Sequence, residues 1–135
     1  MPISFAWADE HHTTVQYTFD GAWTWDDWYA VYAAGMALET SVDHRVDIIL
    51  DLRQSGRMPA NILAHLKKII TMRPSGQGVY VVVTPAPTIK TLFNIGCRFD
   101  SQFKQLYRLV DTPNQARRLI AESRLDAMKT PTPLR

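Results

Sequence analysis

The sequence predicts an α/β fold with a mostly parallel sheet of four to five strands and about four helices, in the order β-β-α-β-α-β-α-β-α. Two apolar runs, 46–52 and 79–83, are nearly continuous, as strands buried on both faces require. They alternate with segments whose apolar residues recur at helical spacing, which is typical of parallel strands joined by right-handed crossovers. We expect one domain over residues 1–124 and a flexible, proline-rich tail over 125–135.

The first part of the chain predicts a hairpin followed by a helix. Residues 3–7 and 13–21 alternate between apolar and polar side chains, as strands do, and the intervening Ala-Asp-Glu-His-His sequence is the simplest connection. Residues 24–40 change to helical spacing, and Thr24 with Asp27 forms a capping-box pattern at the start. The apolar face of this helix is aromatic: it contains Trp25, Trp28, Tyr29, Tyr32 and Met36.

The second half of the chain predicts three more helices around two short strands. Residues 59–72 carry an aliphatic stripe and begin with a proline, which suits a first helical turn. After the 79–83 strand and a Thr-Pro-Ala-Pro-Thr break, residues 89–103 carry a second stripe. Residues 106–110 form a short strand pattern, and within 111–123 the sequence Thr-Pro-Asn-Gln at 112–115 is a capping-box start for the last helix.

Composition narrows the class of protein. The chain has 135 residues, which suits one domain, and a net charge of +2 is too weak to indicate nucleic-acid binding. One cysteine, Cys97, excludes an internal disulfide and favours a reducing compartment. The chain shows no basic segment followed by an apolar stretch at its start, and its apolar runs fall short of the roughly 20 residues that a membrane helix needs. We therefore expect a soluble cytoplasmic protein without membrane contact.

Several segments, in their order, resemble the STAS domains, and especially the SpoIIAA-like branch of these bacterial anti-sigma-factor antagonists. The resemblance covers roughly residues 13–124 and rests on three sequences: FDGAWTWDDWYAVY, DIILDLR and LFNIGCRFDSQFKQLYRLVDTPNQARRLI. In the last of these, the positions that match the family pattern are Gly96, Phe103, Thr112 and Ala116. The resemblance implies a STAS-like fold and a non-enzymatic, regulatory domain that binds a protein partner.

The loop after the central strand departs from that family. Members that act as switches carry a phosphorylated serine there, whereas the matching positions in this chain are Pro59, Ala60 and Asn61. The resemblance therefore does not extend to the usual phosphoacceptor. Ser55, a few residues earlier, has two interpretations: a displaced phosphoacceptor between two arginines, or a turn residue beside Gly56. We favour the turn.

The same loop is the main candidate for a binding site. The carboxyl ends of parallel strands meet at one edge of a sheet, where open α/β folds place their binding crevice. The candidate residues for partner or anion binding are Arg53, Ser55, Gly56, Arg57 and Asn61. The candidates for a neighbouring pocket or interface are Trp23, Thr84 and Pro85.

No motif predicts catalysis or a metal. The Walker-A and G-x-G-x-x-G spacings are absent, and a Ser55–His65–Asp51 triad lacks the nucleophile elbow. The adjacent histidines of the hairpin turn point to opposite sides in an extended segment. Cys97 on a packed helix is expected to act as a small hydrophobic residue. We therefore expect no catalytic residue, no metal and no cofactor.

Two functions remain open. The first is a regulatory protein-interaction domain, for which a homodimer is one arrangement. The alternative is a domain that binds a small or lipid-like molecule in a pocket between the aromatic helix 24–40 and the sheet.

Overall fold

The computed structural model describes residues 2–62, 64–65, 68, 78–99 and 107–129. It has an α/β fold with one five-stranded sheet in the order β1-β2-β3-β4-β5. Strands β1 (Ile3–Trp7) and β2 (Thr14–Gly21) form an antiparallel hairpin. Strands β3 (Asp47–Ser55), β4 (Tyr80–Val83) and β5 (Tyr107–Val110) follow, each parallel to the strand before it. The two apolar runs are therefore neighbours in one parallel layer, as predicted.

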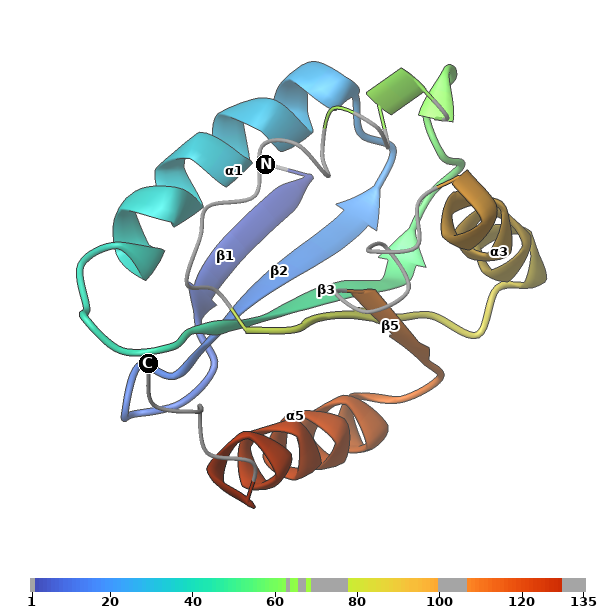
Figure 1. The fold of residues 1–135 in the computed structure, drawn as a ribbon. Helices are drawn as coiled ribbons and strands as arrows, with labels where there is room; N and C mark the ends of the chain where they lie inside the picture. Colours follow the sequence, from blue (N-terminus) through green and yellow to red (C-terminus); the bar gives the residue numbers. More distant parts are fainter. Residues whose placement is uncertain (1, 63, 66–67, 69–77, 100–106, 130–135) are drawn as a thin grey trace.

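Three helices cover the sheet in the part of the chain that the structure describes: α1 (Trp25–Glu39), α3 (Pro87–Phe99) and α5 (Pro113–Lys129). Helices α1 and α5 lie on opposite faces of the sheet (Figure 1). Ile89 and Phe93 of α3 pack against the same core as α1. Within the expected helix at 59–72, residues 62, 64, 65 and 68 are helical, and most of the others lie outside the described residues.

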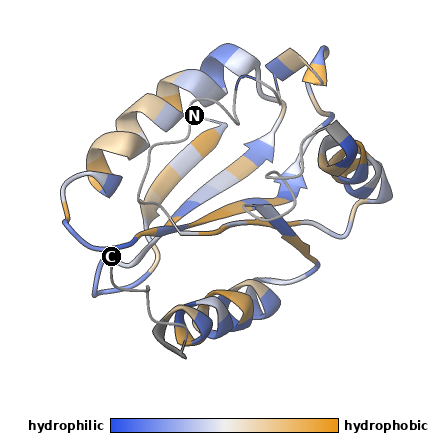
Figure 2. Cartoon of the chain, in the orientation of Figure 1, coloured by the Kyte–Doolittle hydropathy of each residue, from blue (hydrophilic) through white to orange (hydrophobic). Residues whose placement is uncertain are grey.

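The two faces of the sheet have different cores because successive residues of a strand point to opposite sides. Ile48 packs into an aromatic core with α1, whereas Ile49 packs into an aliphatic core with α5. The aromatic core includes Tyr17, Phe19, Trp23, Trp28, Tyr32, Tyr80 and Tyr107, and the aliphatic core includes Val81, Val83, Ala116 and Ile120. Figure 2 shows apolar residues along the central strands between the helices, and both polar and apolar residues along α5.

Local chemistry explains how α1 begins and how closely it packs. The predicted capping box is present: the Asp27 amide donates to Thr24 Oγ1 (3.1 Å), and the Thr24 amide donates to the Asp27 carboxylate (2.9 Å). At Gly35 a β-carbon would overlap the hydroxyl of Tyr17 on β2. Glycine at this position therefore allows the helix to approach the sheet closely.

Two predicted boundaries were wrong. Strand β3 continues to Ser55, because Asp20 and Gly21 of β2 still pair with Gln54 and Ser55 beyond a bulge. Arg53 and Ser55 are therefore strand residues, and Ser55 is not in a turn. Helix α5 continues to Lys129, past the domain end expected at residue 124, because the sequence has no glycine or proline between 114 and 130 to stop it. No helix among the described residues has the length and apolar character needed to cross a membrane.

Candidate functional site

An apolar cavity of about 100 Å³ lies on the α1 face of the sheet, between α1, α3 and the second half of β3. Its volume is about two-thirds of the roughly 150 Å³ that suffices for benzene in an apolar protein cavity. The lining side chains are large and apolar: Phe19, Trp23, Trp25, Trp28, Leu50, Leu52, Met58, Ile62, Val82, Ile89, Leu92, Phe93 and Tyr107. The cavity therefore suits an apolar group of a few carbon atoms.

Two tryptophans connect the wall of this cavity to the end of β3 and to the segment that follows it. A left-handed backbone at Gly21 (φ 73°) turns the chain from β2 towards α1. The Trp23 indole N–H then donates to Ser55 Oγ (2.9 Å), and the Trp25 indole N–H donates to the Ala60 carbonyl (2.7 Å). Because both indole N–H groups have a hydrogen-bond partner, the rings can present apolar surface to the cavity.

His65 belongs to an aromatic cluster beside this wall. Its ring stacks on Trp25 with the centroids 4.3 Å apart, and its Nδ1 lies 2.6 Å from the Tyr29 hydroxyl. Ser55 bonds to Trp23 instead, and Asp51 bonds to Arg53. The three residues of the rejected triad thus have separate partners, and His65 helps to hold the cavity wall.

An open groove of about 670 Å³ adjoins the cavity at the carboxyl edge of the sheet. It brings six of the predicted site residues together: Arg53, Ser55, Gly56, Arg57, Thr84 and Pro85. Its other lining residues are Leu52, Met58, Ala86, Pro87, Thr88 and Ile89. Trp23 lies in the cavity wall rather than in the groove, and Asn61 is exposed, with a left-handed backbone (φ 64°), and lines neither.

The charge of the groove comes from Arg57. Arg53 forms a bidentate pair with Asp51, through Nε–Oδ1 (2.9 Å) and Nη2–Oδ2 (2.8 Å) contacts. Burial acts to raise the pKa of Asp51, but the hydrogen bonds and the charge of Arg53 outweigh it and lower the pKa. Arg57 is exposed and has no hydrogen bond or ion pair with the residues that the structure describes. No acidic residue is among the described residues that line the groove, so this part of the groove favours anions.

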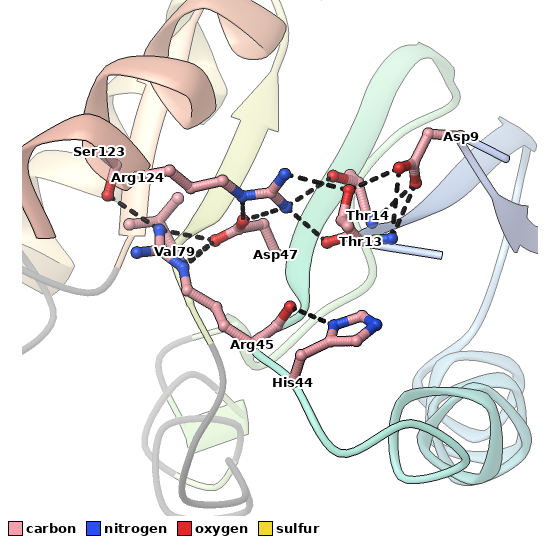
Figure 3. Close-up of polar contacts among 9 residues, drawn as sticks. All are labelled: Asp9, Thr13, Thr14, His44, Arg45, Asp47, Val79, Ser123 and Arg124. Atoms are coloured by element: carbon pink, nitrogen blue, oxygen red, sulfur yellow. Dashed lines mark hydrogen bonds and ion pairs between the residues drawn. The ribbon is translucent and has the colours of Figure 1, made fainter. Parts of the chain in front are cut away.

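A second polar cluster lies at the opposite, amino-terminal end of β3 (Figure 3). The Asp47 carboxylate is fully buried and accepts hydrogen bonds from Arg45 Nε (2.9 Å), the Val79 amide (2.9 Å) and Arg124 Nε (2.7 Å). Arg124 also donates to the Thr13 carbonyl (2.6 Å). These bonds join β3 and α5 to the residues just before β2 and β4, so we interpret the cluster as structural.

The Asp47 cluster was not predicted, although the sequence contains a signal for it. Asp47 and Asp51 both interrupt the aliphatic run Val-Asp-Ile-Ile-Leu-Asp-Leu. A carboxylate in a buried strand needs a cationic or hydrogen-bonding partner, because burial of an unpaired charge is costly. The pattern therefore predicts that partners exist, but it does not identify Arg124, which is 77 residues further along the chain.

A buried acid lies at the end of α1. Glu39 is 5% exposed, and burial raises its pKa to about 7, although the Tyr17 hydroxyl donates a long hydrogen bond to it (3.5 Å) that acts in the opposite direction. Tyr32 and Tyr80 lie in the same core, with their hydroxyls 3.1 Å apart. Glu39 faces these tyrosines and does not line the cavity or the groove.

The remaining residues that could bind a metal ion do not lie together. In the described part of the chain, no three histidine, cysteine or acidic side chains gather closely enough to hold a metal ion. His12 stacks on Trp7 (4.5 Å between centroids), and His11 lies beside Glu10 (3.7 Å). Cys97 is half-buried against the aromatic core. Comparisons with protein-family models, curated proteins and solved structures found no match to this chain.

Proposed function

We propose that this chain is a non-enzymatic, STAS-like regulatory domain that binds a protein partner at the carboxyl edge of its sheet. The proposal includes a fourth helix in the 59–72 region and a mostly parallel sheet of the STAS type. The observation that carries it is the groove, which joins the segments that follow β3 and β4. Open α/β sheets bind their ligands at this edge. Without a serine at positions 59–61, partner binding would not depend on the phosphorylation that controls related switches.

The groove combines features that suit a protein contact. Arg57 supplies an exposed cation, while Pro85 and Pro87 are exposed and Met58 is half-buried. Interfaces are enriched in arginine and methionine, and charge complementarity directs the choice of partner. The expected partner therefore presents acidic and apolar side chains, and a second copy of the chain is one such arrangement.

The test compares Arg57→Glu with Arg118→Glu, a matched reversal on the exposed surface of α5, on the other face of the sheet. Each immobilised variant is exposed to native extract, and captured proteins are quantified against the unmodified chain. We expect at least one protein to bind the unmodified chain and Arg118→Glu equally and to be reduced about tenfold or more on Arg57→Glu, a loss of about 1.4 kcal/mol. The same proteins in the same amounts on all three chains would contradict the proposal.

A second function, binding of a small apolar or lipid-like molecule, is favoured by the cavity beside the aromatic helix. Mass spectrometry of the purified chain under native and then denaturing conditions tests it. We expect an additional mass that denaturation releases and that Leu50→Phe, which fills the cavity, prevents. An added mass that persists in Leu50→Phe would place the ligand elsewhere.

A further inference from the structure

The cavity and the groove adjoin one another. Leu52, Met58 and Ile89 line both, so the two spaces share part of one wall. Arg57 lines the groove next to Met58, one of the shared residues, so the groove brings a cation close to the apolar cavity. An apolar cavity beside a charged groove suits molecules that have one apolar part and one charged part.

We propose that this combined site binds a small amphipathic carboxylate, with its hydrocarbon chain in the cavity and its carboxylate at Arg57. The inference rests on the ligand-binding function proposed above and adds the chemistry of the ligand. An anion is favoured because, among the residues that the structure describes, no acidic side chain lines either the cavity or the groove. A single negative charge matches the groove, since Arg53 is already paired with Asp51 and Arg57 is the other cation among the described lining residues.

The volume of the cavity limits how much of the ligand's hydrocarbon chain can be buried. A volume of about 100 Å³ is equivalent to roughly three water volumes of about 30 Å³ each, which is room for about three or four carbon atoms. A longer chain would leave its carboxyl end in the groove, within reach of a flexible arginine. Arginine also forms bidentate hydrogen bonds with carboxylates, which fixes the orientation of the bound molecule.

The experiment measures the affinity of octanoate and of octan-1-ol, which has the same chain without a charge, by titration calorimetry below the micelle-forming concentration. We expect octanoate to bind about tenfold more tightly than octan-1-ol. Arg57→Gln should remove this preference, and the matched control Arg118→Gln should retain it. Leu50→Phe, with the cavity filled, should weaken both probes.

Each other outcome overturns the inference in a recognisable way. Equal binding of both probes, unaffected by Arg57→Gln, would leave an apolar ligand site and refute the carboxylate. Undiminished binding to Leu50→Phe would show that the probes bind outside the cavity. Absence of binding by both probes would refute the carboxylate site, while the partner-capture experiment would still test the protein-interaction function separately.

Discussion

The Glu39→Gln variant should become progressively more stable than the unmodified chain as the pH rises from 5 to 8. Burial raises the pKa of Glu39 from its ordinary value of 4.5 to about 7. Between these values the folded chain keeps the proton and the unfolded chain releases it, so the free energy of unfolding falls with rising pH. Glutamine has nearly the same shape and stays neutral, so the free energy of unfolding of the variant does not fall in this way.

The magnitude follows from the two pKa values. Each pKa unit corresponds to about 1.4 kcal/mol, and integrating between pH 5 and pH 8 gives about 2–3 kcal/mol for a carboxyl whose pKa moves from 4.5 to about 7. The stability difference between Glu39→Gln and the unmodified chain should therefore grow by about 2–3 kcal/mol over this range. Contributions from all groups that the two proteins share cancel in this difference.

Urea denaturation followed by tryptophan fluorescence at pH 5, 6, 7 and 8 measures this difference. Glu122→Gln, at an exposed position on α5, is the matched control and should show a constant difference across the range. A constant difference for Glu39→Gln as well would refute the reasoning, because it would mean that the Glu39 carboxylate is ionised at little cost in the folded protein.

Three further substitutions test the packing, each by the free energy of unfolding in urea. Trp28→Ala should cost about 3–5 kcal/mol, because Trp28 is buried in the aromatic core; a loss below 1 kcal/mol would place it outside. Arg124→Gln should cost about 2 kcal/mol, because it removes one of the two cations paired with buried Asp47. An unchanged free energy of unfolding would show that Arg124 does not stabilise the fold. Gly35→Ala should destabilise the protein by about 1–3 kcal/mol, because the added methyl group overlaps Tyr17. A more stable variant would contradict this, because it would mean that the lower conformational entropy of alanine in the unfolded chain outweighs any overlap.

Residue spacing predicted the α/β class because it reports local burial. The run at 46–52 is buried on both faces, and the helix at 24–40 has its aromatic stripe against the sheet. The spacing of apolar residues does not show where the pairing between two strands ends. Strand β3 extends to Ser55 because β2, far earlier in the chain, continues to pair with it beyond a bulge.

In the candidate site too, the features that follow from topology were predictable, and those that depend on side-chain geometry were not. The carboxyl-edge rule placed Arg57 and Pro85 in one groove, because it follows from topology alone. The division of the two arginines into a paired one and an available one could not be predicted, since it depends on the geometry of Asp51 and Arg53. Asn61 lies outside the groove because the chain turns away through a left-handed residue at that position.

The indole N–H resonances of the four tryptophans, followed during titration with octanoate, test the ligand-binding account most directly. Trp23, Trp25 and Trp28 line the cavity, whereas Trp7 stacks on His12 in the hairpin and serves as an internal control. The account predicts saturable shifts for the three cavity tryptophans, no shift for Trp7, and loss of the shifts in Leu50→Phe. Equal shifts at all four tryptophans, or no shift at any, would contradict it.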